Sequence, residues 1–195
     1  MSTNLNAFIL ADPNKCIGCR VCEVACSVAH TEGAAVTAGM LDAPLIAKLY
    51  LVKTSTVTMP IQCRHCEDAP CAQVCPVGAI TQTKGNIIID ESSCMGCKTC
   101  LMACPFGAID FAPVYRNGQV VMQSALQVET EDGLMEKEMV VASKCDLCAG
   151  HAAGPACVRA CPENALEMVV PKQEKKKRNI EAALSLQDAV KKFIG

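Results

Sequence analysis

Sixteen cysteines stand out in the 195-residue sequence, and they form four groups of four with none left over. The first and third groups share the spacing C-x2-C-x2-C-x3-C, the second is C-x2-C-x4-C-x3-C, and the fourth is C-x2-C-x8-C-x3-C. Three cysteines on one tight loop can bind three corners of an iron–sulfur cube, and the fourth follows where the chain leaves the loop as a short helix. The spacing therefore predicts four [4Fe–4S] clusters.

Two other uses of cysteine compete with this interpretation. Zinc also binds four thiolates, but usually through two C-x2-C knuckles separated by a spacer. Disulfides need an oxidising compartment, whereas Met1–Leu10 has neither the basic nor the apolar region of a signal peptide. The sequence also lacks an uncharged apolar run of 18 residues or more, so we expect no membrane-spanning helix. We therefore expect a cytoplasmic protein with reduced thiols that bind iron–sulfur clusters.

An internal repeat indicates how the four groups combine. Groups one and three, which begin at Cys16 and Cys94, are copies of one unit 78 residues apart, and groups two and four also resemble each other. Only 18 residues separate Cys75 from Cys94, and this gap contains two strand-like runs around Lys84-Gly85-Asn86. Groups two and three should therefore form one ferredoxin-like module, and groups one and four the other. The second module would close by pairing a strand before Cys16 with a strand at Leu166.

In two-cluster bacterial ferredoxins, the fourth cysteine of each group ligates the cluster of the other group. We expect the same exchange within each module here. The predicted ligand sets are Cys16, Cys19, Cys22 and Cys161 for the first cluster, Cys145, Cys148, Cys157 and Cys26 for the second, Cys63, Cys66, Cys71 and Cys104 for the third, and Cys94, Cys97, Cys100 and Cys75 for the fourth. Proline follows the fourth cysteine in three groups, but Ser27 follows Cys26, which should alter the packing around one cluster.

The fold class that follows is α+β, with two bacterial ferredoxin-like modules produced by duplication. Module A comprises residues 1–55 and 140–171, and module B comprises residues 56–112. Residues 113–139 form an insert, which we expect to fold as a hairpin because Gln119–Met122 and Met139–Ala142 are strand-like. Residues 172–195 form a C-terminal segment with an amphipathic helix over Ile180–Ile194, for which packing on its own domain, docking on another subunit and membrane contact are all open.

Single residues inside the binding loops have two interpretations each. His65 lies between two predicted ligands. One interpretation makes it a proton-coupled group or an N–H donor to sulfur. The other, which we favour, makes it a packed or surface histidine. Gly18 and Gly96 occupy equivalent positions in the repeat. Because glycine adopts positive φ easily, we expect both to turn backbone N–H groups toward sulfur.

Longer motifs make the resemblance to a known family specific. The segments Cys63-Arg-His-Cys-Glu-Asp-Ala-Pro-Cys71, Lys144-Cys-Asp-Leu-Cys148 and Gly154-Pro-Ala-Cys157 resemble the four-cluster electron-transfer subunits of formate dehydrogenases and formate hydrogenlyase, over roughly residues 6–171. The sequence is most similar to the formate hydrogenlyase type, which includes subunits of hydrogen-dependent carbon dioxide reductase. The resemblance implies a molybdenum or tungsten formate dehydrogenase and a hydrogenase as partners in an anaerobic complex.

The expected function is electron transfer without catalysis, because every cysteine is used as a ligand and no Walker or Rossmann motif is present. Bound clusters would lower the formal net charge of −2 to roughly −10, which disfavours nucleic acid as a partner. The C-terminal helix suggests further copies of the chain or a paralogue as additional partners. Competing functions are an electron-transfer subunit of another molybdopterin oxidoreductase, a free polyferredoxin shuttle, an enzyme with one catalytic cluster, and a zinc-stabilised interaction module.

Overall fold

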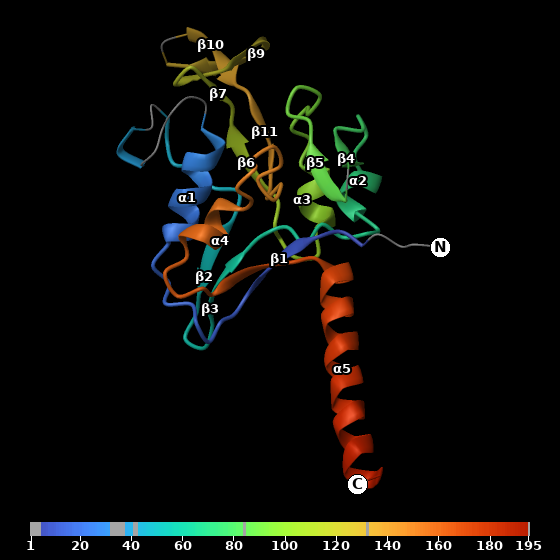
Figure 1. Cartoon of the computed structure of the whole chain (residues 1–195). Helices are drawn as coiled ribbons and strands as arrows, with labels where there is room; N and C mark the ends of the chain where they lie inside the picture. The colour runs from blue at the N-terminus through green and yellow to red at the C-terminus, as the bar shows by residue number, and fades with distance from the viewer. Residues whose placement is uncertain (1–4, 32–37, 41–42, 84, 132, 195) are drawn as a thin grey trace.

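The chain folds from short helices and strands that alternate with the cysteine loops (Figure 1). The structure is a computed structural model that describes residues 5–31, 38–40, 43–83, 85–131 and 133–194. The helices are α1 (Val21–His30), the 3₁₀ turn η1 (Ala38–Met40), α2 (Pro70–Gln73), α3 (Thr99–Ala103), α4 (Ala156–Ala160) and α5 (Pro171–Ile194). The strands are β1 (Phe8–Ala11), β2 (Tyr50–Lys53), β3 (Thr58–Ile61), β4 (Ile80–Thr83), β5 (Asn86–Ile89), β6 (Asp110–Pro113), β7 (Tyr115–Arg116), β8 (Gln119–Val120), β9 (Met122–Thr130), β10 (Gly133–Glu138), β11 (Val140–Ser143) and β12 (Leu166–Val169).

Within the described residues, each strand pairs with one other strand, and all of these two-stranded sheets are antiparallel. β4 pairs with β5 in the gap between groups two and three, where the sequence predicts a hairpin, although Lys84 of its turn lies outside the described residues. β1 pairs with β12 across almost the whole chain, with Ala11 opposite Leu166. This pairing is the predicted closure of the terminal strands, and it brings the segments next to groups one and four together.

Two further strand pairs link the two expected modules. β2 pairs with β3, and β6 pairs with β11. Each pair joins a strand that follows one cysteine group to a strand that precedes another. The strand pairing therefore crosses the expected module boundaries near residues 55 and 140. Pairing is favourable here because an isolated edge strand would leave its backbone hydrogen-bonding groups unpaired. The helices pack within the expected units, α1 against α4 and α2 against α3.

The buried residues form two small cores rather than one. The first contains Ile9, Leu49 and Leu166, together with cysteines of groups one, two and four. The second is built around Ile80, Ile87 and Ile109, together with cysteines of groups two and three. Aromatic residues make up only 3% of the chain, so these cores lack the large rings that usually supply most buried area. Cysteine side chains occupy a large part of the interior instead.

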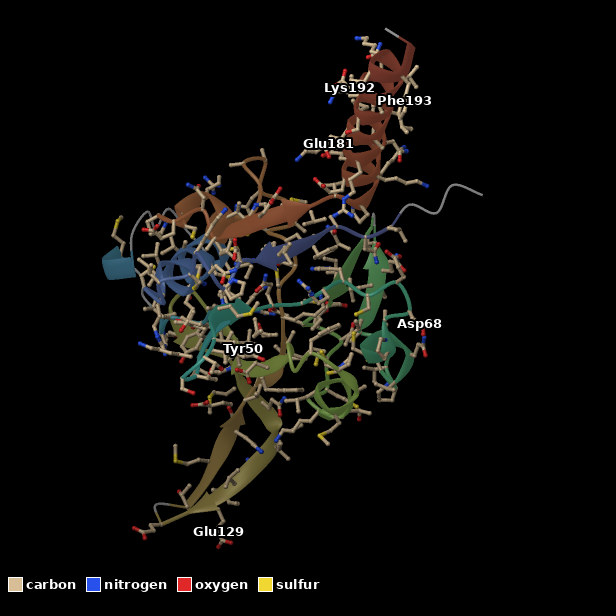
Figure 2. All side chains as sticks on the ribbon, turned by 90° about the horizontal axis from the view of Figure 1, so that it is seen from below. Tyr50, Asp68, Glu129, Glu181, Lys192 and Phe193 are labelled. Atoms are coloured by element: carbon tan, nitrogen blue, oxygen red, sulfur yellow. The ribbon has the colours of Figure 1, made fainter. Side chains whose placement is uncertain are left out.

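The insert and the C-terminal segment extend from opposite ends of this body (Figure 1). The insert contains a hairpin of β9 and β10, which lies mostly between the two expected runs. The first expected run contains β8 (Gln119–Val120), which pairs with β7. The second overlaps β11 (Val140–Ser143), which pairs with β6. Figure 2 shows Glu129 near the tip of this hairpin.

The C-terminal helix differs from the prediction in its length and in its surroundings. α5 begins at Pro171, nine residues before the expected start at Ile180. Proline is favourable in the first turn of a helix, where its missing N–H has no helical partner in any case. Leu186 is 67% exposed and Phe193 is 90% exposed, so the expected alternative of a helix packed on its own domain is wrong. Figure 2 shows Phe193 at the far end of this projecting helix. No helix in the described residues is long and apolar enough to cross a membrane.

Candidate iron–sulfur centres

The four C-x2-C loops share one backbone feature that allows each to curl around a centre. The residue before the second cysteine of each loop has positive φ: 74° at Gly18, 48° at His65, 69° at Gly96 and 60° at Leu147. Glycine adopts this conformation easily, whereas histidine and leucine do so at a cost in energy. The sequence indicated the two glycines, but nothing in the residue types at His65 and Leu147 indicated that they share the same turn.

Helices begin directly after these turns in groups one and three. Arg20 and Lys98 have positive φ values of 62° and 67° and precede the first helical residues of α1 and α3. Each helix then presents its group's third cysteine on its first turn, and Cys22 and Cys100 are both buried. The repeated sequence therefore folds into a repeated loop and helix start.

Three small cavities in the structure are each lined by four cysteines. In each cavity, three cysteines come from one group and the fourth comes from another. The sets are Cys16, Cys19, Cys22 and Cys161 in the first cavity, Cys75, Cys94, Cys97 and Cys100 in the second, and Cys63, Cys66, Cys71 and Cys104 in the third. Each of these cavities therefore brings together cysteines of two different groups.

The remaining four cysteines also lie together, and they are the most deeply buried set. Cys26, Cys145, Cys148 and Cys157 are between 4% and 7% exposed. Three of them, Cys26, Cys145 and Cys157, pack in the same apolar core. Burial and the nearby thiols Cys26 and Cys148 raise the pKa of Cys157 to about 12.

The thiol environments fit a bound cation. All sixteen cysteines, each within the described residues, are free thiols rather than disulfides. Burial is the main cause that raises the pKa of Cys71 to about 11, and the neighbouring thiol Cys63 adds to it. Burial also raises the pKa of Cys22 to about 11. Four converging thiolates would repel one another in such places unless a positively charged centre held them. The donor sets therefore match a metal cluster with four thiolate ligands.

Backbone N–H groups are directed at many of these sulfur atoms. The amide of Ala108 donates to Cys104 Sγ at 3.4 Å, and the amide of Ala165 donates to Cys161 Sγ at 3.3 Å. Five more amides donate to sulfur, from Lys48, His65, Ala142, Leu147 and Ala156. Hydrogen bonds of this kind stabilise negative charge on sulfur and raise the reduction potential of a cluster.

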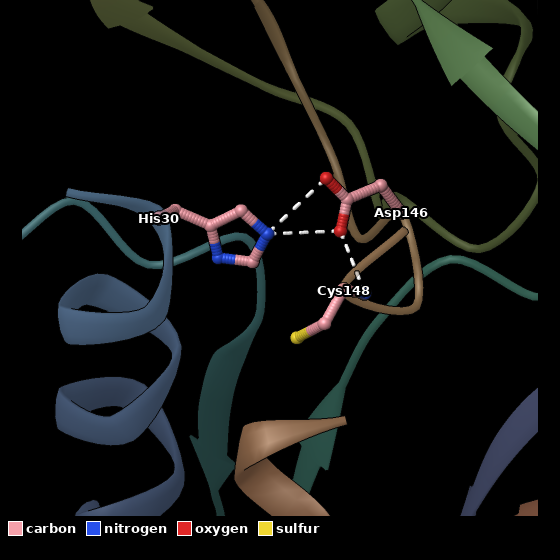
Figure 3. Close-up of side chains that lie close together, drawn as sticks. All are labelled: His30, Asp146 and Cys148. Carbon is pink, nitrogen blue, oxygen red and sulfur yellow. Dashed lines mark hydrogen bonds and ion pairs between the residues drawn. The ribbon is translucent and has the colours of Figure 1, made fainter. Parts of the chain in front are cut away.

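Group one departs from the other groups after its fourth cysteine, and the departure has a structural consequence. Where Pro105 follows α3 and Pro162 follows α4, Ser27 allows α1 to continue to His30. His30 Nδ1 lies 2.8 Å from Cys26 O and 3.7 Å from Cys26 Sγ, and its Nε2 lies 2.9 Å from Asp146 Oδ1. Figure 3 shows His30 directed from α1 toward Asp146, with Cys148 beside them.

Asp146 is the centre of a polar cluster at this position. Its carboxylate also accepts hydrogen bonds from Lys48 Nζ at 3.2 Å and from the Cys148 amide at 2.9 Å. Burial opposes ionisation of both groups, but Asp146 and Cys26 as hydrogen-bond partners raise the pKa of His30 to about 10. In the same way, His30 and Lys48 outweigh burial and hold the pKa of Asp146 well below its usual range. Sequence reasoning missed this cluster, because 116 residues separate His30 from Asp146.

His65 and Lys144 are buried in the interior. His65 is 1% exposed and its Nδ1 accepts a hydrogen bond from the Ile87 amide at 3.0 Å. Burial, with a smaller effect of Lys144, lowers the pKa of His65 to about 4, so the ring is neutral. This is the packed histidine that the sequence favoured, although its backbone amide does donate to Cys63 Sγ at 3.3 Å. Lys144, which sequence reasoning did not single out as a functional residue, is 4% exposed.

Comparison with protein families matches the cysteine groups. Residues 54–118 and residues 93–166 each match a family described as a 4Fe-4S dicluster domain. Residues 13–29 match a 4Fe-4S binding domain. These segments include all four cysteine groups, so the chain carries multiple 4Fe–4S clusters.

Comparison with characterised proteins extends the similarity to most of the chain. Hydrogenase-4 component A of Escherichia coli K12 is 42% identical over 196 residues, which cover 92% of each protein. The electron transport protein HydN of the same strain is 42% identical and covers 83% of this chain and 87% of its own length. Formate hydrogenlyase subunit 2 is 39% identical over 90% of each protein. The chain therefore belongs to the family of 4Fe–4S electron-transfer proteins that includes HydN and hydrogenase-4 component A.

Proposed function

We propose that this chain carries four [4Fe–4S] clusters on its sixteen cysteines, in the four sets that the sequence predicts, and relays electrons between a formate-oxidising subunit and a hydrogenase. The observation that carries the proposal is the set of three cavities, each lined by three cysteines of one group and one of another. The fourth set is buried around Cys157. When bound, each cluster supplies reversible uptake and release of one electron.

The protein's own residues hold and tune these centres. The thiol groups supply the ligands, and the amide donors at Cys26, Cys63, Cys104 and Cys161 stabilise negative charge on sulfur. The apolar residues of the two cores shield the buried cysteines from water, whereas Cys19 and Cys97 are exposed. A fold that changes little between oxidised and reduced states suits electron transfer, and the short strand pairs and helices fix each loop at both ends.

The named relatives support the choice of partners. Hydrogenase-4 component A and formate hydrogenlyase subunit 2 are named as parts of hydrogenase and formate hydrogenlyase systems. Their similarity supports a molybdenum or tungsten formate dehydrogenase catalytic subunit and a hydrogenase subunit as partners of this chain. A cytoplasmic location is part of the proposal, because cluster ligation requires the sixteen thiols to stay reduced.

The test is anaerobic affinity purification from the native host, with iron and acid-labile sulfide analysis of the chain and mass spectrometry of the proteins that co-elute. About sixteen iron and sixteen sulfide atoms per chain are expected for four cubane clusters. Recovery of both a formate dehydrogenase and a hydrogenase supports the relay. Recovery of a different reductase would retain the clusters and overturn the choice of partners, and four zinc ions without sulfide would overturn the iron–sulfur assignment itself.

We further propose that α5 docks on a further copy of the chain or on a paralogue. Leu186, Val190 and Phe193 recur at helical spacing on α5 and are more than half exposed. Truncation after Pro171 should leave the cysteine cavities intact, because none of their lining residues lies on α5. The truncated protein should retain its visible absorption spectrum but elute as a smaller assembly by size-exclusion chromatography. An unchanged assembly size would rule out docking through α5.

A further inference from the structure

Lys144 carries a charge that no described carboxylate compensates. Its side chain is buried, with 4% of its surface exposed. The ion pairs among the described residues involve Asp12, Glu23 and Asp146, and none of them includes Lys144. Placing an ammonium group away from water without a counterion is strongly unfavourable. Something anionic should therefore lie near Lys144 in the working protein.

The contacts of the ammonium group place it between two of the cysteine sets. Lys144 Nζ donates to the carbonyl oxygen of Cys145 at 3.0 Å and also to the carbonyl oxygen of Ile87. Cys145 belongs to the deeply buried set, whereas Ile87 lines the cavity of Cys63, Cys66, Cys71 and Cys104. One buried cation thus joins the walls of two centres that belong to different expected modules.

We propose that Lys144 is a positioning residue whose fixed positive charge stabilises the reduced state of the two clusters bound by the Cys145 set and the Cys63 set. This inference rests on the cluster assignment proposed above. Each reduction adds one negative charge, and a nearby cation in a medium of low dielectric constant favours the more negative state. These two centres should therefore be easier to reduce than they would be without Lys144, and the clusters supply the anionic partner that the ammonium group otherwise lacks.

A merely structural interpretation makes a different prediction. The two carbonyl contacts could act only as a tether between the Cys145 loop and β5. In that case, a side chain that donates hydrogen bonds without a charge would serve equally well. Glutamine donates N–H groups but is neutral, and arginine donates N–H groups and is charged. The Lys144→Gln and Lys144→Arg variants therefore separate charge from tethering.

The experiment uses the full-length chain, purified anaerobically and analysed for iron and sulfide, followed by redox titration monitored by EPR. In Lys144→Gln, two of the four clusters should show at least a tenfold loss in the ratio of reduced to oxidised form at a fixed potential. This loss corresponds to a reduction potential lower by about 59 mV for a one-electron couple. Lys144→Arg should restore both potentials. Lys53→Gln, at an exposed lysine of β2, is the matched control and should shift none of them.

Every outcome bears on the inference. If Lys144→Gln cannot retain iron whereas Lys144→Arg does, the charge is required for assembly and the inference stands. If the glutamine and arginine variants lose iron alike, shift alike or leave all four potentials unchanged, the inference is overturned. An unaltered chain without 4Fe–4S clusters would overturn the proposed function as well, whereas unshifted potentials in a fully loaded variant overturn this inference alone.

Discussion

His30 Nε2 lies 2.9 Å from Asp146 Oδ1, although 116 residues separate them in the sequence. The contact joins the C-terminal end of α1 to the loop between Cys145 and Cys148, so it connects two segments that supply cysteines of the buried set (Figure 3). Both side chains are largely buried, at 14% and 20% exposure. A charged hydrogen bond in this environment should contribute to the stability of the whole terminal unit.

Replacement of this histidine should therefore weaken the chain measurably. His30→Ala removes the charged hydrogen bond to Asp146 and the hydrogen bond to Cys26 O, but it leaves Lys48 as a partner for Asp146. We therefore expect a loss of at least about 1.5–3 kcal/mol in the free energy of unfolding. The loss can be measured as a lower urea midpoint for bleaching of the visible absorption under anaerobic conditions. His151→Ala, at an exposed histidine near His30, is the control and should change the midpoint little. Equal midpoints for the two variants would show that the contact contributes nothing.

The serine after Cys26 offers a second test, because it determines how far α1 extends. Proline at position 27 would remove a helical N–H and clash with the preceding turn, at a cost of about 3 kcal/mol or more. Ser27→Pro should therefore end α1 early, displace His30 from Asp146 and reduce iron retention. Ser27→Ala loses only the hydrogen bond from Ser27 Oγ to Glu23 O, which is 3.1 Å long, and should be milder. If the proline variant unfolds at the same urea concentration as the alanine variant, the length of α1 is unimportant here.

The two loop glycines provide a matched pair within the repeat. Both have positive φ, so alanine should be strained at either position. At Gly96, however, a Cβ would lie 2.7 Å from the backbone oxygen of Val140, whereas at Gly18 it would lie 3.0 Å from the Thr58 side-chain methyl. A backbone strand cannot move aside as easily as a side chain. Gly96→Ala should thus cost about 1–3 kcal/mol more than Gly18→Ala, measured as the difference between their urea midpoints. A greater loss in Gly18→Ala would contradict this reasoning.

The sequence predicts the parts of this fold that depend on local spacing and repetition. The β1–β12 and β4–β5 pairs follow from strand patterns beside the cysteine groups, and the gathering of cysteines follows from their spacing. The β6–β11 pair could not be predicted, because β11 lies next to group four in the chain but joins a strand after group three. α5 starts at Pro171, before the amphipathic pattern over Ile180–Ile194 that predicts the helix.

The unpredicted features of the candidate site depend on contacts between distant segments. His30 meets Asp146 only because two loops pack together, and nothing near either residue indicates the other. The burial of Lys144 likewise depends on its reach to Ile87, 57 residues earlier in the chain. Lysine is rarely fully buried, and nothing in its sequence position beside Cys145 indicates the burial. Composition and spacing thus identify ligands, whereas the groups that tune them emerge only from the packed structure.

Metal removal tests the view that clusters take the place of a large apolar core. Each of the two cores is small and contains several cysteines, so the folded chain should depend on its metal. Treating the purified protein with a chelator under reducing conditions should abolish the visible absorption and most of the near-ultraviolet circular dichroism together. Anaerobic reconstitution with iron and sulfide should restore both signals, whereas zinc alone should not restore the visible absorption. A metal-free chain that retained a cooperative thermal transition at the original temperature would show that the apolar contacts suffice without clusters.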